Sequence, residues 1–138
     1  MYHTTNPSNA YGFRGWRIRS DYQWGVSPEE YDFHVHEGVK LNAPYQVGVL
    51  TANQCYVIDA SWFTDSALVD YSTAPRGAAF VDDIWLNGHL AKLGVKRFIV
   101  PISDASLDIA ETKTLDDKMR SKRVSRHAAN SATLAWFK

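Results

Sequence analysis

The segment 81–94 constrains the fold most, because it predicts a helix that leads at once into a strand. Asp82 and Asp83 open it, and acidic residues are favoured in the first turn of a helix. Gly94 suits the position just after a helix, where the backbone turns left-handed. The next five residues, 96–100, read Lys-Arg-Phe-Ile-Val and predict a strand. This helix and strand belong to the alternation of helices and strands from which an α/β fold is expected.

The rest of the chain adds strands and short helices to this unit. Alternating apolar residues predict strands, and the run Ser27-Pro28-Glu29-Glu30 is a capping box with proline at the first helical position. We expect strands over 10–19, 45–50 and 54–58, a helix from Ser27 to about His36 that ends at Gly38, a helical turn at 61–63, and a terminal helix over 126–137. Strands that alternate with helices predict an α/β or α+β domain.

The chain of 138 residues is long enough for one domain with a sizeable core. Its composition changes once, near residue 103, from aromatic-rich to polar. We therefore expect an α/β core over 1–102, a flexible polar loop over 103–125 and a C-terminal helix over 126–138.

Charge and cysteine content exclude several classes of protein. Lys and Arg together number 15, as do Asp and Glu, so the net charge is zero and offers no global field for nucleic acid. No apolar run is long enough to span a bilayer, and the first residues lack the pattern of a signal peptide. The single cysteine, Cys55, forms no intrachain disulfide and is expected to be a buried structural thiol. A reducing, cytoplasmic location is the expectation.

Asp82 and Asp83 are the strongest candidates for chemistry. The helix N-terminus stabilises both anions, whereas their mutual repulsion raises the pKa of one of them. If one carboxylate caps the helix, the other is left to point into a cleft, where it suits the role of general base for a hydroxyl group. The alternative from spacing alone is an ordinary amphipathic helix with acids in its first turn.

The same helix carries two candidate ligand-binding side chains. Trp85 and His89 are four residues apart and share a face, with Lys92 further along, while the apolar residues Ile84, Leu90 and Leu93 are expected to face the core. Aromatic residues are frequent, 18 of 138, and offer flat faces to sugars. Trp85 and His89 beside the acidic pair would form a sugar-contacting wall.

Three stretches resemble family-2-like glycosyltransferases with a GT-A fold, and this resemblance implies an α/β domain with a mixed sheet. The first is Val81-Asp82-Asp83-Ile84-Trp85-Leu86-Asn87-Gly88-His89-Leu90-Ala91, followed by Gly94-Val95-Lys96-Arg97 and Pro101, which is similar to the acidic-pair helix of that family. The second, Tyr45-Gln46-Val47-Gly48-Val49-Leu50-Thr51-Ala52-Asn53, resembles a turn that lines the sugar site. The third, Gly12-Phe13-Arg14-Gly15-Trp16-Arg17, resembles a strand that follows the nucleotide-binding half.

The resemblance implies a function and assigns roles. A sugar passes from a nucleotide-sugar donor to a hydroxyl of a carbohydrate or glycan acceptor, with Asp83 as the base and Asp82 as its acidic neighbour. Trp16, Asn53, Trp85 and His89 would contact the sugars. A divalent cation, Mn²⁺ or Mg²⁺, is expected for the full enzyme, and basic residues of the stretch 120–126 could help to stabilise the leaving diphosphate.

One family motif is missing, which restricts this expectation. The chain contains no Asp-x-Asp, the motif that holds the cation and the donor diphosphate. It therefore looks like the C-terminal, acceptor-side portion of a GT-A enzyme, to be completed by an N-terminal half or by a homo-oligomer. The alternative is a non-catalytic truncated relative that binds a saccharide or pairs with a catalytic subunit.

His34-Val35-His36 raises a further alternative, a metal-dependent hydrolase. On a strand both rings would share a face, as metal binding requires, but the capping box places them on a helix, where residues two apart diverge. We therefore expect surface histidines and no metal site in this chain, with the alternative that one of them, or His127, reaches a metal ion held mainly by the missing half.

Overall fold

The computed structural model describes residues 2–25, 34–64, 66–103 and 125–138. The capping box at Ser27 and almost all of the polar loop predicted over 103–125 lie outside these described residues.

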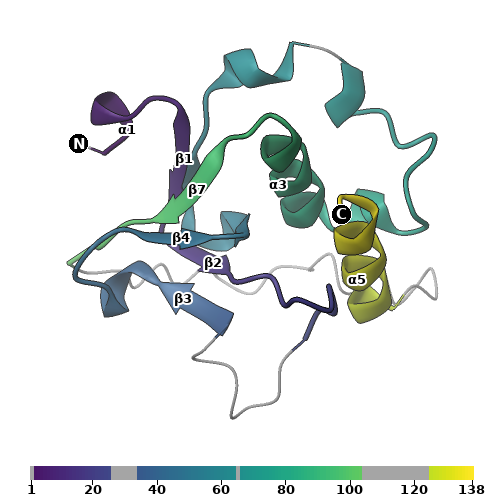
Figure 1. Ribbon diagram of the computed structural model, residues 1–138, viewed down its shortest axis with the longest axis horizontal. Coiled ribbons are helices and arrows are strands. Elements are labelled where there is room, and N and C mark those ends of the chain that lie inside the picture. The colour runs from purple at the N-terminus through teal and green to yellow at the C-terminus, as the bar shows by residue number, and fades with distance from the viewer. Residues whose placement is uncertain (1, 26–33, 65, 104–124) are drawn as a thin grey trace.

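The described strands form two small sheets, so the α/β class with a mixed sheet is confirmed (Figure 1). The four-stranded sheet has the order β4 (Tyr45–Val47), β7 (Lys96–Ile99), β1 (Asn9–Gly12) and β6 (Tyr56–Val57). The three-stranded sheet has the order β3 (Val35–Glu37), β2 (Arg14–Trp16) and β5 (Val49–Leu50). The first sheet is mixed, because β1 runs parallel to β7 while β4 and β6 are antiparallel to their neighbours.

Two of the expected strands are each divided between the sheets by one residue. Phe13 separates β1 from β2, and Gly48 separates β4 from β5. The N–H groups of both residues bond outside the regular ladders, that of Phe13 to Cys55 O and that of Gly48 to Trp16 O. Beyond these breaks β2 and β5 pair with each other, with Trp16 opposite Val49.

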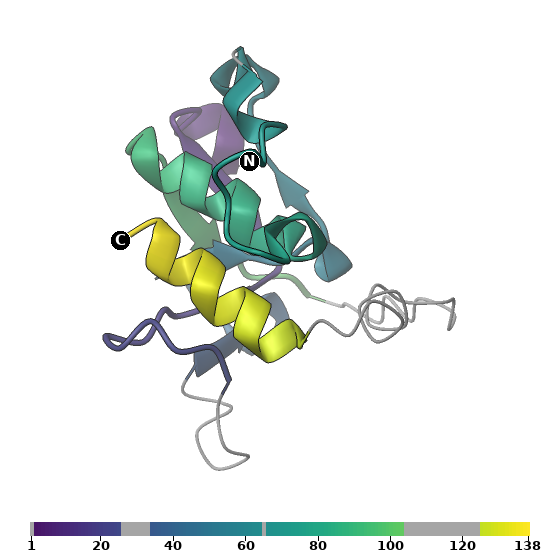
Figure 2. The same cartoon turned by 90° about the vertical axis from the view of Figure 1, so that its right-hand side faces the viewer.

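The α-helices of the described residues are α1 (Tyr2–Thr5), α3 (Asp82–Lys92) and α5 (Arg126–Trp136). α3 ends as the sequence predicts, with Gly94 in the left-handed conformation at φ 73°. α5 begins at a cap that the sequence analysis missed, since the Oγ of Ser125 accepts a hydrogen bond from Ala128 N. α3 and α5 lie side by side, with α1 away from both (Figures 1 and 2). Short 3₁₀ turns are η2 (Gly38–Lys40), η3 (Ala52–Gln54), η4 (Ala60–Phe63), η5 (Ser66–Leu68) and η6 (Ala78–Phe80).

α3 joins two parts of the core. On the four-stranded sheet its Leu90 is fully buried in a cluster with Ala10, Val47, Leu50, Val95 and Ile99. Its first turn supplies Ile84 to a second cluster, which contains Val49, Val81, Ala129 and Leu134. The N-terminal end of α3 is therefore held between β5 and α5.

The helix expected to reach His36 is wrong from Val35 onward, where the chain forms β3, whereas His34 is helical as expected. Val35 pairs with Trp16 across the antiparallel β2–β3 ladder, and the N–H of Arg17 donates to His34 O at 2.9 Å. Strand pairing with a segment some twenty residues earlier decides this conformation, and a local capping signal cannot register such pairing.

Two burial expectations are also wrong. Leu93 is 55 % exposed, because it follows the last residue of α3 and lies where the chain leaves the helix. Cys55 is exposed rather than buried, and it adopts φ 63° in the turn between η3 and β6. Ile84 and Leu90 are buried as expected.

No helix within the described ranges combines the length and the apolar character that crossing a bilayer demands.

Gly15→Ala is expected to destabilise the three-stranded sheet. A Cβ atom at this position would lie 2.5 Å from the backbone oxygen of Val49, so β5 would have to move away from β2. We expect unfolding in urea to show a loss of about 1–3 kcal/mol, typical of overpacking. Gly94→Asn serves as the control, because the site has open space and asparagine tolerates its left-handed backbone. A Gly15→Ala variant as stable as the parent would contradict the close approach of these strands.

Candidate functional site

A cavity of about 390 Å³ lies at the N-terminal end of α3, and we call it the Asp83 cavity. It gathers four of the six predicted site residues, namely Trp16, Asn53, Asp82 and Asp83. Its other lining residues come from β2 and the segment after it, from the turn after β5, from the start of α3 and from α5. They are Arg14, Trp24, Thr51, Val81, Ile84, Arg126 and Asn130. Segments far apart in the sequence thus meet around the acidic pair.

Asp83 is held in place by the turn that follows β5. Its Oδ1 accepts a hydrogen bond of 3.0 Å from the N–H of Ala52, and its side chain is half-buried. Neither acid caps α3, contrary to expectation: the N-cap is Val81, with no side-chain cap. Because Asp83 makes its bond to η3 rather than to its own helix, a second carboxylate oxygen is left for a ligand in the cavity.

Asn87 fixes the geometry between α3 and β5, a role that was not predicted from the sequence. Its Oδ1 accepts from Leu50 N at 2.9 Å, and its Nδ2 donates to Leu50 O at 2.9 Å and to Asp83 O at 2.7 Å. The side chain is 1 % exposed. An asparagine inside an otherwise regular helix, four residues after Asp83, was the available signal.

The environment of Asp83 raises the pKa of its carboxyl group to about 6. Burial is the largest cause, and the negative charge of Asp82 adds to it; the Ala52 N–H, Arg126 and Arg14 act in the opposite direction. Asp82 itself is exposed. A carboxylate that titrates near pH 6 is well suited to accept a proton close to neutral pH.

Aromatic and basic side chains complete the Asp83 cavity. The rings of Trp16 and Trp24 lie with their centroids 4.6 Å apart. The backbone N–H of Trp24 donates a hydrogen bond to Ser131 Oγ in α5. Arg14 forms an ion pair with Glu37 in β3, with 3.5 Å between Nε and Oε1. Arg126, from the basic stretch considered in the sequence, lies at the first position of α5 and lines the cavity.

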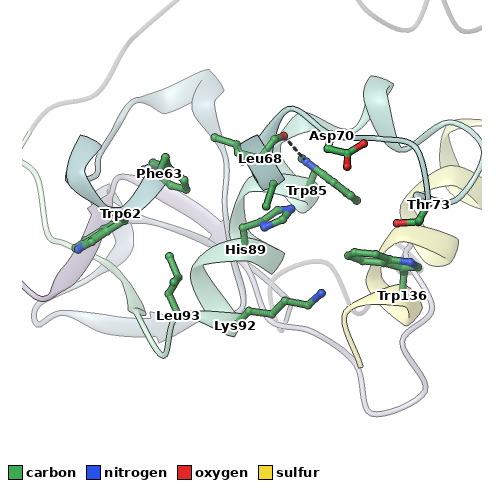
Figure 3. A pocket seen from close by; sticks show the side chains of 11 residues that line it. Trp62, Phe63, Leu68, Asp70, Thr73, Trp85, His89, Lys92, Leu93 and Trp136 are labelled. Atoms are coloured by element: carbon green, nitrogen blue, oxygen red, sulfur yellow. Dashed lines mark hydrogen bonds between the residues drawn. The ribbon is translucent and has the colours of Figure 1, made fainter. Parts of the chain in front are cut away.

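The other two predicted site residues, Trp85 and His89, line a different cavity (Figure 3). Trp85 is 2 % exposed, and its Nε1 donates to Leu68 O at 2.7 Å. The rings of Trp85 and His89 meet edge to face at 4.8 Å. These two side chains therefore do not form a wall with the acidic pair.

His34 and His36 are not surface residues, contrary to expectation, because His34 is buried and His36 is half-buried. His36 lies on β3 while His34 is helical, so the two residues do not lie on one helix. His36 packs against the ring of Tyr45, with centroids 4.4 Å apart. Over the ranges that the structure describes, no three His, Cys, Asp or Glu side chains come together as ligands for a metal ion.

A scan against protein-family models, a search of curated proteins and a search of solved structures each found no match to this chain.

Proposed function

We propose that the Asp83 cavity is the acceptor side of a glycosyltransferase site, in which Asp83 removes a proton from a carbohydrate hydroxyl. The observation that carries this proposal is the raised pKa of a half-buried carboxylate that lines a cavity and has one oxygen fixed by a backbone N–H. The resemblance of three stretches of the sequence to GT-A enzymes of the family-2-like type supports the same chemistry.

The proposed step moves one proton and exchanges one bond. Asp83, ionised, accepts the proton of the acceptor hydroxyl as that oxygen forms a bond to the anomeric carbon of the donor. The bond from this carbon to the diphosphate breaks, and the diphosphate leaves with the electron pair. Arg14 and Arg126 line the cavity and are placed to offset its negative charge.

The divalent cation expected for the full enzyme does not fit the described part of this chain. Asp82 and Asp83 are the only acids of the Asp83 cavity among the described residues, and no third ligand joins them. We therefore derive no step through Mn²⁺ or Mg²⁺. We assign any divalent cation to residues other than those described.

Trp16, Trp24 and Asn53 supply the contacts of a saccharide site. The two indoles offer apolar faces to a sugar ring, and the Asn53 amide offers both a donor and an acceptor to hydroxyl groups. The direct test is a transfer and hydrolysis screen with nucleotide-sugars, in the presence of Mn²⁺ or Mg²⁺ and of neutral oligosaccharide acceptors. Lack of turnover under all conditions would contradict the catalytic proposal.

The pH dependence of turnover is expected to report the pKa of Asp83. The base must be ionised, so log kcat/KM should rise with unit slope at low pH and level off above about pH 6. Asp82→Asn removes a charge that raises this pKa, and the limb should move to lower pH. The pH dependence of kcat/KM, measured for the parent and for the Asp82→Asn variant, checks this. An acidic limb at the same pH in both proteins would contradict the assignment of Asp83 as the base.

The non-catalytic alternative is a saccharide-binding or subunit-pairing module, and binding measurements separate it from the enzyme. A module would bind oligosaccharides in the Asp83 cavity without turnover, and Asp83→Asn would change only that affinity. An enzyme would lose turnover with the same substitution.

A further inference from the structure

We propose that the cavity drawn in Figure 3 is a second binding site, specific for a neutral saccharide unit. We call it the aromatic cavity and define it by Trp62, Phe63, Asp70, Thr73, Lys92 and Trp136. Its volume is about 300 Å³. Asp83 plays no part in it, so the inference goes beyond the proposed function and stands independently of it.

Half-buried aromatic rings from two distant segments form its walls. Trp62 and Phe63 come from η4, and Trp136 comes from the end of α5. Faces of indole and phenyl rings are apolar surfaces on which the C–H side of a sugar ring can pack. Figure 3 shows Trp62 and Trp136 at opposite ends of the cavity.

Trp85 makes the cavity a fixed structure. Its buried indole contacts Trp136, with centroids 5.2 Å apart, and its Nε1 donates to Leu68 O in η5. Tyr71 stacks on Trp85 at 4.7 Å. The segment that carries Asp70 and Thr73 is therefore tied to the helix that carries Lys92, and the site needs little reorganisation to bind a ligand.

Two opposite charges face the cavity without contacting each other. The Nζ of Lys92 lies 4.0 Å from the ring centroid of Trp136 and forms no ion pair with a carboxylate of the described residues. Asp70 accepts a hydrogen bond from Ser72 N at 2.9 Å, and the bonds to Ser72 keep the pKa of its carboxyl group below the usual value. Figure 3 shows Asp70 and Lys92 on opposite sides of the space, with Thr73 beside Trp136.

This combination of groups identifies the ligand class. One carboxylate and one ammonium group cancel, so the site has no net attraction for an anion or a cation. Lys92 donates hydrogen bonds, Asp70 accepts them and Thr73 does both, as the hydroxyl groups of a sugar require. The volume is at the low end of the range for ligand pockets, which suits one ring-sized unit.

The tryptophans allow the two cavities to be observed separately. Of the five in the chain, Trp16 and Trp24 line the Asp83 cavity, while Trp62, Trp85 and Trp136 line the aromatic cavity. The indole N–H signals of ¹⁵N-labelled protein, assigned with single Trp→Phe variants, would be followed during titration with maltotriose, cellotriose and chitotriose. We expect at least one of these sugars to move the signals of Trp62 and Trp136.

Matched variants test the polar groups. Lys92→Ala and Asp70→Asn should each weaken saccharide binding about tenfold, the effect of losing one charged hydrogen bond. The Asn side chain keeps an oxygen for Ser72 N, so the turn around Asp70 should survive. Lys96→Ala is the control, because Lys96 is an exposed lysine on β7 that does not line the cavity.

The titration of the indole signals has outcomes that support the aromatic cavity as a saccharide site and outcomes that overturn it. Shifts at Trp62 and Trp136 that weaken in the Lys92 variant but not in the Lys96 variant support it. No shift at these indoles with any trisaccharide, or shifts caused by adenosine or uridine and not by the sugars, would overturn it. Shifts confined to Trp16 and Trp24 would also overturn it while supporting the proposed function of the Asp83 cavity.

Discussion

Asp83→Asn is expected to lower glycosyl transfer by about 10²–10⁴-fold, the range for loss of a general base. The substituted amide keeps an oxygen that can accept the hydrogen bond from Ala52 N, so the geometry of the cavity is retained. It cannot take up a proton near neutral pH. The measurement is kcat/KM at pH 7 with the donor and acceptor found in the screen, and a variant with near-normal turnover would remove Asp83 as the base.

Asp83→Asn is also expected to raise the stability of the folded protein near neutral pH, although it lowers turnover. The folded-state pKa of Asp83, about 6, lies above the ordinary value of 3.8, so the folded protein binds the proton more tightly than the unfolded chain. This contribution to stability is present below about pH 4 and is lost as the pH rises through about 6. At pH 7 the Asn variant should therefore be more stable than the parent, by about 1 kcal/mol after allowance for partial exposure.

Asp82→Asn is the matched control for both effects. Asp82 is the neighbouring acid on the same first turn of α3 but is exposed and makes no hydrogen bond to η3. We expect it to retain most of the turnover at pH 7 and to change stability by no more than about 0.5 kcal/mol, as is usual for a surface site. Equal losses in the two variants would show that the acidic pair acts only through its total charge.

Asn87→Ala is expected to cause the largest loss of stability, about 3–5 kcal/mol. The substitution leaves the N–H and the C=O of Leu50 without their side-chain partner inside the protein, and it creates a void at a position that is 1 % exposed. Unsatisfied buried groups cost about 1–3 kcal/mol each. Urea denaturation measures the effect directly, and the Asp83 cavity should lose its shape because β5 is no longer held to α3.

Asn130→Ala provides the comparison for this result. Asn130 is also buried, at 4 % exposed. Unlike the Asn87 side chain, which bonds to both backbone groups of Leu50, the Asn130 side chain makes no such pair of bonds to a strand within the described residues. We expect it to lose about 1 kcal/mol. Similar losses at both positions would mean that burial of the side chain, rather than the bonds to Leu50, stabilises this part of the core.

The sequence predicts α3, its end at Gly94 and β7 well, because their signals are local. Acids in the first turn, a glycine after the last turn and a β-branched apolar run each act within a few residues. β3 could not be predicted in the same way. Its conformation depends on pairing with β2, and no pattern within 34–38 reports that a partner strand lies beside it.

In the candidate site, too, the residues with a local sequence signal were predicted, whereas those that depend on tertiary packing were not. Asp83 and Asn53 were found because a local motif or turn carries them, and the fold brings them together. Trp85 and His89 were expected beside Asp82 on the strength of helix spacing alone. Spacing gives the direction of a side chain but not the neighbour that it meets, and the neighbour here is the turn at Leu68. Trp24 and Asn130 enter the cavity only through tertiary packing.

The passage of the chain from one sheet to the other through the lone residues Phe13 and Gly48 limits how the length of this protein can vary. Successive side chains of a strand point to opposite faces, so one residue inserted or deleted at Phe13 would reverse β2. Arg14 and Trp16 would then turn out of the Asp83 cavity, and Gly15, which fits closely against Val49, would be replaced by a larger neighbour. Proteins that share this architecture should therefore keep the spacing between Gly12 and Trp16 constant even where the residues themselves differ.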